Sequence, residues 1–190
     1  NTSGGSITTM VLNSTTQNLR WKAYVGNVTG IFTLDDAGGF TVFDWTIATT
    51  VGEVYATRAS SAINWNNVNC STFANITNEE ITINHTTNPN DNISRTFNAQ
   101  QHGSFYVGST LIGQNSCYSV HTYVNDTAQN TDFEEVILHD GLSMVYATVI
   151  ENDAYSYRNN LTYDFQMIVP ENGLATWISS TAYYFYVELT

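Results

Sequence analysis

Short β-prone runs, separated by glycine- and asparagine-containing turns, recur along this chain and restrict its fold more than any other feature. The clearest set lies between Arg20 and Arg58. Glycine occurs at the breaks between these runs, and it reaches the positive φ that tight connections between antiparallel strands need. We therefore expect four successive strands in this stretch, near Leu19–Val25, Gly30–Asp35, Phe40–Ile47 and Gly52–Thr57.

Two tryptophans mark this stretch, Trp21 in the first expected strand and Trp45 in the third. At matching depths in neighbouring antiparallel strands, they would bury a large apolar area at one end of a core. The alternative is a surface hairpin with stacked aromatic rings. We take the stretch as the centre around which the remaining strands are organised.

The rest of the chain continues the same pattern, and no 3.6-residue periodicity persists beyond about one turn. Glu134–His139 and Ser143–Glu151 flank an Asp-Gly turn and should pair as a hairpin. We expect further strands at Ile7–Leu12, Glu80–Asn84, Ser94–Asn98, Ser104–Ile112, Cys117–Val124, Leu161–Val169 and Thr181–Leu189, the last two paired. The pattern predicts an all-β fold, an antiparallel β-sandwich of immunoglobulin-like or jelly-roll type. Residues 19–190 would form the single domain and residues 1–18 an N-terminal extension.

The charge balance is strongly acidic, with 17 Asp and Glu against five Lys and Arg and a net charge of −12. Phosphate binding draws on clustered Lys and Arg, so nucleic acid and anionic membrane surfaces are disfavoured partners. No apolar run of about 18 residues is present, and we expect no direct membrane insertion. The chain begins with polar Asn1, as a mature protein would after removal of a signal peptide, which favours an extracellular, cell-surface location.

Asparagine is in informative excess. With 22 Asn and 42 Ser and Thr in 190 residues, chance gives roughly five Asn-x-Ser/Thr triplets, and nine occur. Such triplets accept N-glycans in exported proteins, although some can arise from composition alone. The predicted glycosylation sites are Asn1, Asn13, Asn27, Asn69, Asn75, Asn84, Asn92, Asn125 and Asn160. We expect Asn75, Asn84, Asn92 and Asn125 to lie in loops, and a glycan on Asn69 to be the least certain.

The two cysteines, Cys70 and Cys117, show no C-x-x-C pattern of a metal or redox site. In an exported protein, an isolated pair predicts one disulfide. This bond would tie the Asn- and Ser-rich excursion Ser60–Asn78 to the strand that begins at Cys117. On the entropic model, closing this loop would raise the free energy of the unfolded chain by about 4 kcal/mol and so stabilise the folded protein. Two free buried thiols are the alternative.

Residues that could support catalysis or metal binding are scattered. Zinc would need at least three ligands to converge from the dispersed histidines His85, His102, His121 and His139. The acidic turns at Asp35-Asp36 and Glu151-Asn152-Asp153 could bind Ca²⁺ but match no EF-hand loop. A glycosidase could pair Glu53 with Asp164 or Glu134 with Glu151, as any acidic β-protein could. We predict no catalytic residue, no metal and no cofactor.

The candidate donor strand Ile7–Leu12 is apolar on both faces, with Ile7 and Val11 on one and Met10 and Leu12 on the other. A glycine pair precedes it and a polar segment, residues 13–18, follows it. An edge strand that faces water should not be apolar on both sides. We therefore predict that these four residues contact the next subunit, where the strand inserts between the sheets. The alternative is that the strand completes its own sheet.

The phrases WKAYVGNVTG, LDDAGGFTVFDW and GEVYATR, together with YDFQMIVPENG and AYYFYVEL, resemble a group of exported archaeal surface proteins. The resemblance implies a β-sandwich fold and no enzymatic role. Several archaeal surface filaments consist of glycosylated β-sandwich subunits joined by terminal-strand donation.

The sequence thus predicts a non-enzymatic, N-glycosylated subunit of an archaeal, pilus-like surface filament, assembled from copies of itself. The main alternative is a secreted carbohydrate-binding or adhesin domain. For that function, aromatic residues in or near loops could form a sugar-stacking platform: Trp65, Tyr155, Tyr157 and Trp177.

Overall fold

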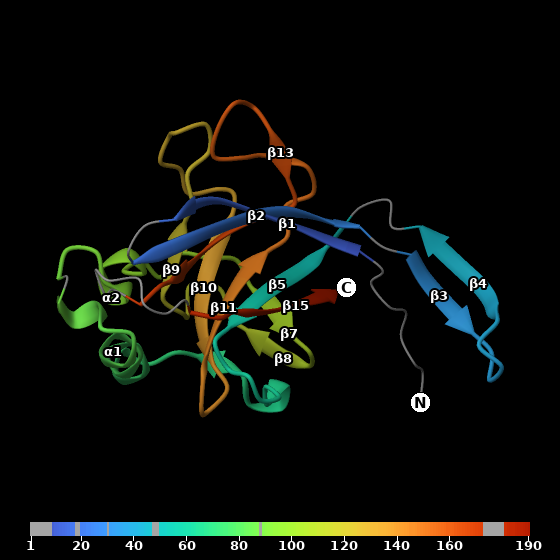
Figure 1. Ribbon diagram of the computed structural model, residues 1–190, viewed down its shortest axis with the longest axis horizontal. Coiled ribbons are helices and arrows are strands. Elements are labelled where there is room, and N and C mark those ends of the chain that lie inside the picture. Colours follow the sequence, from blue (N-terminus) through green and yellow to red (C-terminus); the bar gives the residue numbers. More distant parts are fainter. Residues whose placement is uncertain (1–8, 18–19, 30, 47–49, 88, 173–180) are drawn as a thin grey trace.

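The computed structural model describes residues 9–17, 20–29, 31–46, 50–87, 89–172 and 181–190, which form mainly antiparallel strands (Figure 1). This confirms the predicted all-β class. The strands are β1 (Thr9–Gln17), β2 (Trp21–Thr29), β3 (Ile31–Asp35), β4 (Thr41–Thr46), β5 (Gly52–Thr57), β6 (Asn69–Cys70), β7 (Phe105–Val107), β8 (Thr110–Ile112), β9 (Ser119–His121), β10 (Glu134–His139), β11 (Met144–Val149), β12 (Ala154–Tyr155), β13 (Thr162–Tyr163), β14 (Phe165–Pro170) and β15 (Tyr184–Leu189). The helices are α1 (Phe73–Thr82) and α2 (Ile93–Thr96), with 3₁₀ turns η1 (Trp65–Asn67) and η2 (His85–Thr87).

Two larger sheets carry the fold. One has three strands in the order β1-β2-β14, and the other has the order β15-β5-β11-β10-β6, with β9 also paired to β10. Three two-stranded pairs complete the described strands: β3–β4, β7–β8 and β12–β13. The predicted hairpin across the Asp140-Gly141 turn is confirmed as β10–β11, in antiparallel register from Glu135↔Thr148 to His139↔Met144.

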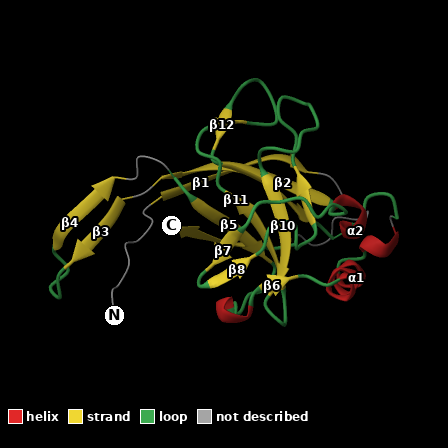
Figure 2. Ribbon diagram, turned by 180° about the vertical axis from the view of Figure 1, so that it is seen from behind, coloured by secondary structure: helices red, strands yellow, loops and turns green. Residues whose placement is uncertain are grey.

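The larger sheet is buried on both faces, because successive residues of its central strands enter two separate hydrophobic clusters. On β10, Ile137 belongs to the first cluster, whereas Val136 and Leu138 belong to the second. Residues of β2 and β14, such as Val28 and Phe165, complete the first cluster from the three-stranded sheet. The two sheets therefore pack around a shared core, with α1 and α2 beside it (Figures 1 and 2).

The second cluster is covered by the segment before β6 and by the β7–β8 pair. The predicted disulfide between Cys70 and Cys117 lies at this cover and is confirmed. Cys70 is on β6, opposite Leu138 of β10, and Cys117 is buried just before β9. The bond thus ties the excursion before α1 to the edge of the larger sheet.

The segment after Cys70 differs from the prediction, because it is helical. The side chain of Thr72 accepts a hydrogen bond from the Asn75 backbone N–H, and the Asn75 side chain accepts one from the Thr72 N–H. This capping box begins α1. The expected strands Glu80–Asn84 and Ser94–Asn98 are wrong: they overlap α1 and α2. Phe73 is exposed in α1 whereas Ile76 is buried, so the apolar period is too weak to recognise.

Two predicted strand arrangements are also wrong. The four strands between Arg20 and Arg58 do not form one meander, because β2 and β5 belong to different sheets and β3–β4 to neither. Likewise, β14 pairs with β2 and β15 pairs with β5, so the last two long strands are not partners. Trp21 is buried in the first cluster as expected, whereas the Trp45 side chain lies outside the described residues.

Candidate assembly surface

The candidate donor strand lies on its own chain in this structure. β1 pairs antiparallel with β2, from Thr9↔Thr29 to Gln17↔Lys22, with an irregularity between Ser14 and Thr16. The strand therefore continues through most of the polar segment, residues 13–18, that follows the predicted donor strand. Ile7 lies outside the described residues, and Met10 is described only by its backbone pairing. The arrangement is the one that the sequence left as the alternative, a strand that completes its own sheet.

Pairing with β2 nevertheless leaves Val11 and Leu12 of β1 in contact with water. Val11 and Leu12 point to opposite faces of the strand, yet they are 47% and 37% exposed. β1 is also an outer strand, and its second edge has no strand partner among the described residues. Val11 and Leu12, the two members of the predicted apolar set whose side chains are described, thus lie on opposite faces and are not buried by the described residues.

The position of β1 on β2 depends on Gly26. This glycine lies opposite Leu12 on β1 and opposite Phe165 on β14. A Cβ placed at Gly26 would collide with the carbonyl oxygen of Val11 and lie 3.0 Å from the Phe165 ring. Because only glycine allows this close approach, Gly26 shapes the slot in which β1 lies.

A second protruding element is the β3–β4 pair, residues 31–46, which we call the hairpin. It stands apart from the two sheets at one end of the molecule (Figures 1 and 2). Its described apolar side chains are strongly exposed: Leu34 (46%), Phe40 (75%), Val42 (65%) and Phe43 (53%). An isolated two-stranded hairpin is at best marginally stable in water, so packing against another surface would stabilise it.

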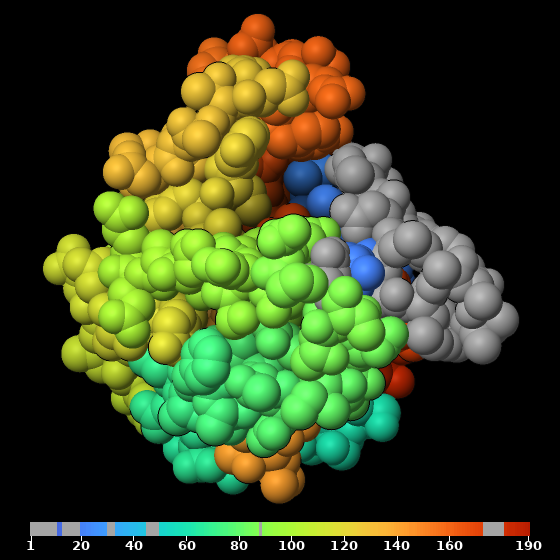
Figure 3. Space-filling model, turned by 90° about the vertical axis from the view of Figure 1, so that its left-hand side faces the viewer, coloured from blue at the N-terminus to red at the C-terminus, as the bar shows by residue number. Residues whose placement is uncertain are grey.

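The body of the molecule contains an apolar groove of about 390 Å³, which we call the groove. Its lining comes from β2 and β14 and, on one side, from residues 121–132 and 151–163, which include the β12–β13 pair and which we call the upper lobe. Figure 3, viewed from the end opposite the hairpin, shows the hollow between the yellow and orange upper lobe and the light-green segment around α2. Most of its lining is apolar or aromatic and includes Val25, Val120, Tyr123, Tyr157, Met167 and Ile168.

A buried glutamine holds the groove in shape. The Gln166 amide on β14 donates hydrogen bonds to Thr122 Oγ1 and to the carbonyl oxygen of Tyr123, both at 3.0 Å. Its oxygen accepts hydrogen bonds at 2.8 Å from Ser156 Oγ and from the Tyr157 N–H. Because one side chain fastens both loops of the upper lobe to β14, the groove wall is preorganised.

Each of the four histidines has a local structural contact. His85 is buried with Nε2 at 2.7 Å from the Glu171 carbonyl oxygen, and His102 Nε2 accepts a hydrogen bond from the Cys117 N–H. His121 Nε2 lies 4.0 Å from Glu134 Oε2. His139 Nδ1 accepts a hydrogen bond from the Gly141 N–H. Within the described residues, no three His, Cys, Asp or Glu side chains gather so as to hold a metal ion.

Asp164 and Glu53, one of the two pairs proposed for glycoside cleavage, have different surroundings. Both Asp164 oxygens accept backbone hydrogen bonds, from Val28 and Asp153. Glu53 lies on β5 directly opposite Glu188 of β15. The acidic turn at Asp35-Asp36 is self-contained, because an Asp36 oxygen accepts the Gly38 and Phe40 N–H groups.

Burial and, to a smaller extent, the Glu188 carboxylate together raise the pKa of Glu53 from its ordinary value of 4.5 to about 7. The folded protein therefore binds the carboxyl proton of Glu53 more tightly than the unfolded chain does. Between the pKa values of 4.5 and about 7, unfolding releases this proton. Stability should thus fall as the pH rises from about 5 to 8. We expect Glu53→Gln to stabilise the protein by about 1–3 kcal/mol at pH 8 and by little at pH 5.

Chemical denaturation at both pH values would measure this effect, with Asp126→Asn as the control because Asp126 is exposed. An equal effect of Glu53→Gln at both pH values would contradict the raised pKa of Glu53.

The described residues of the proposed sugar platform belong to different parts of the fold. Trp65 packs between Tyr55 and Tyr186, at ring-centroid distances of 5.1 and 5.2 Å. Tyr155 and Tyr157 belong to the upper lobe, and Tyr157 lines the groove. Trp177 lies outside the described residues.

The asparagines of the predicted glycosylation sites with described side chains are exposed or half-buried. Asn125 is in a loop as predicted, whereas Asn75 lies inside α1 rather than in a loop. Asn84 follows α1 with a φ of 60°, and Asn92 caps α2. The side chains of Asn1 and Asn13 lie outside the described residues.

Comparison of the chain with protein-family models, with curated proteins and with solved structures gives no match. The resemblance to archaeal surface proteins therefore stays a prediction. Among the residues that the structure describes, none of the helices has both the length and the apolar character needed to span a membrane.

Sequence reasoning missed Gly26 and the groove. Gly26 was taken as a turn residue, although its neighbours Val25 and Val28 are both buried. The alternation of Trp21, Ala23 and Val25 is broken at Asn27, so no local pattern marked Gly26 as a strand interior. The groove joins residues from β2, β9, β14 and the upper lobe, and no local pattern links them.

Proposed function

We propose that this protein is a structural subunit of an extracellular, N-glycosylated homopolymer at the cell surface, assembled by donation of the N-terminal strand. The observation that carries the proposal is the exposure of Val11 and Leu12 on opposite faces of a paired outer strand. In the assembly, β1 of one copy would occupy the slot on β2 of the next copy. An archaeal, pilus-like filament is the form of assembly that we favour.

This exchange preserves every contact of the slot, because the same β1 residues meet the same β2 residues in a different copy. Burial of additional apolar area by the neighbouring copy would favour the exchanged state over the monomer. Each copy both donates and accepts, so a head-to-tail arrangement need not close and can propagate into a fibre.

An engineered disulfide tests the exchange directly. Thr9 and Thr29 are Cα partners at the end of the β1–β2 ladder, so Thr9→Cys/Thr29→Cys should form a covalent bond wherever β1 pairs. In assembled protein, we expect a ladder of covalent oligomers on non-reducing gels. The two single-cysteine variants are the controls, and Thr29→Cys alone also controls for the loss of the Asn27 glycosylation triplet. A crosslink found only within monomers would overturn strand donation.

Glycan occupancy is a separate prediction. Because the surface carries few charges, attached sugars would keep its apolar parts soluble. We expect glycans on Asn75, Asn84, Asn92 and Asn125 in natively produced protein. In Asn75, the side-chain oxygen makes the capping contact with Thr72, whereas the glycan would attach to the nitrogen. Glycopeptide mapping that finds all four asparagines unmodified would contradict this.

A further inference from the structure

The hairpin and the groove have complementary properties at opposite ends of the same molecule. The hairpin presents exposed Leu34, Phe40 and Val42, whereas the groove offers an apolar hollow. The hairpin lies at one end of the longest axis in Figure 1, and the groove opens in the view from the other end in Figure 3. A protrusion and a matching hollow on different surfaces form a heterologous contact between copies, which need not close into a ring.

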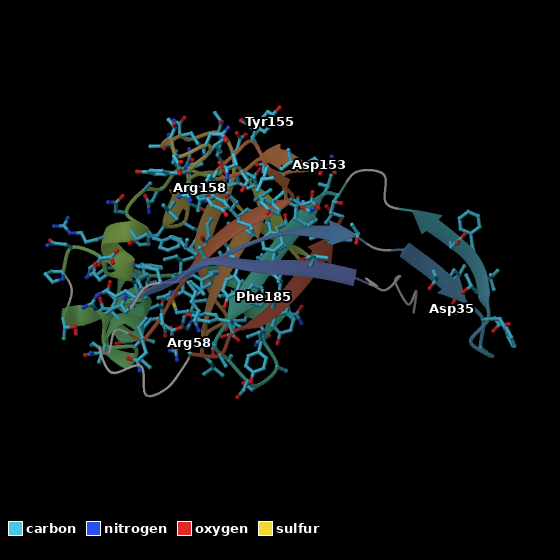
Figure 4. The ribbon with its side chains drawn as sticks, turned by 45° about the horizontal axis from the view of Figure 1, so that its top comes forward. Asp35, Arg58, Asp153, Tyr155, Arg158 and Phe185 are labelled. Atoms are coloured by element: carbon cyan, nitrogen blue, oxygen red, sulfur yellow. A yellow bond between two sulfur atoms is a disulfide. The ribbon has the colours of Figure 1, made fainter. Side chains whose placement is uncertain are left out.

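The charged residues of the hairpin and those next to the groove are also of opposite sign. The hairpin carries Asp35, Asp36 and Asp44 but no basic residue. Of the chain's five basic residues, two adjoin the groove: exposed Arg95 precedes the lining residue Thr96, and exposed Arg158 follows Tyr157. Figure 4 shows Asp35 on the hairpin and Arg158 in the upper lobe, far apart in one chain.

The other three basic side chains, Arg20, Lys22 and Arg58, each have an interaction within their own chain. Lys22 is paired with Glu171, and Arg58 with Glu79. Arg158 lies 3.8 Å from Asp126, but both are strongly exposed, and such pairs are worth little. In a chain with a net charge of −12, two exposed arginines that adjoin lining residues of an apolar hollow favour an acidic, apolar partner.

We propose that the hairpin of one copy docks into the groove of a second copy, with Phe40 and Val42 in the hollow and the hairpin aspartates beside Arg95 and Arg158. The inference rests on the proposed homopolymer and gives it a second contact, independent of strand donation. The groove is preorganised through Gln166, so docking requires no rearrangement of its wall.

The test separates the two contacts. Thr9→Cys/Thr29→Cys protein, oxidised at high dilution, forms its disulfide within one chain and so cannot donate β1. We expect this locked protein still to associate at raised concentration in sedimentation velocity. Phe40→Asp on the hairpin, or Tyr123→Asp in the groove, should each weaken association tenfold or more. Both residues are exposed, so neither change should unfold the protein.

Leu142→Asp is the matched control, because Leu142 is 90% exposed and belongs to neither surface. Mixing Phe40→Asp protein with Tyr123→Asp protein should restore dimers but no larger species, because one intact hairpin then meets one intact groove. The proposal is overturned if the locked protein stays monomeric, if the mixture behaves like its components, or if Leu142→Asp weakens association equally. The locked protein's result does not depend on strand donation, so each proposal can fail alone.

Discussion

Replacing both Cys70 and Cys117 by alanine should lower the free energy of unfolding by about 2–5 kcal/mol. The disulfide closes a loop with a sequence separation of 47, so its loss enlarges the conformational freedom of the unfolded chain. For a domain of this size, we expect a fall in Tm of about 5–15 °C. Calorimetry of the double variant measures the effect.

The loss of stability on removing the disulfide should be uneven across the fold. The bond holds the cover of the second hydrophobic cluster, which includes Ile63, Val68 and Ile112, against the larger sheet. Hydrogen exchange should therefore rise first at residues 59–70 and 105–117, and later in the core around Phe165. Wild-type protein treated with a reductant is the control and should behave like the double variant. An unchanged Tm after complete reduction would contradict this account.

Local patterns predicted where strands occur better than which strands pair. The runs around Glu134–His139 and Gly52–Thr57 were placed correctly, because continuous apolar and β-branched residues mark strands that are buried on both faces. The same sequence pattern in one strand is compatible with pairing to several other strands. Leu161–Val169 was expected to pair with Thr181–Leu189, yet β14 pairs with β2 and β15 with β5. Such long-range choices depend on packing across both sheets, which no local window contains.

The candidate assembly surface was predicted in part. The two-faced apolarity of Val11 and Leu12 was evident from alternation alone, and their exposure agrees with it. The groove could not be predicted, since its residues come from separate segments that Gln166 fastens together. The hairpin was recognised as two strands but was assigned to the core, because Trp45 was expected to be buried with Trp21. The exposure of Phe40 and Phe43 fits the alternative, a surface hairpin.

Gly26→Ala should have the other large effect, because it closes the slot in which β1 lies. The new Cβ would meet the Val11 carbonyl oxygen, which belongs to the backbone and cannot rotate away as a side chain can. β1 must therefore separate locally from β2, or β2 must shift toward the Phe165 ring. We expect a loss of about 2–4 kcal/mol in stability, within the range of severe point mutations.

The slot is the same whichever copy supplies β1, so Gly26→Ala distinguishes a role of the slot from other routes of assembly. With Thr9→Cys/Thr29→Cys, it should reduce crosslinks within chains and between chains alike. Gly113→Ala is the matched control, because a Cβ there would meet only Ser116 Oγ at 3.9 Å, an ordinary contact. If Gly26→Ala protein assembles and crosslinks as the parent does, the slot on β2 is not the site that receives the donated strand.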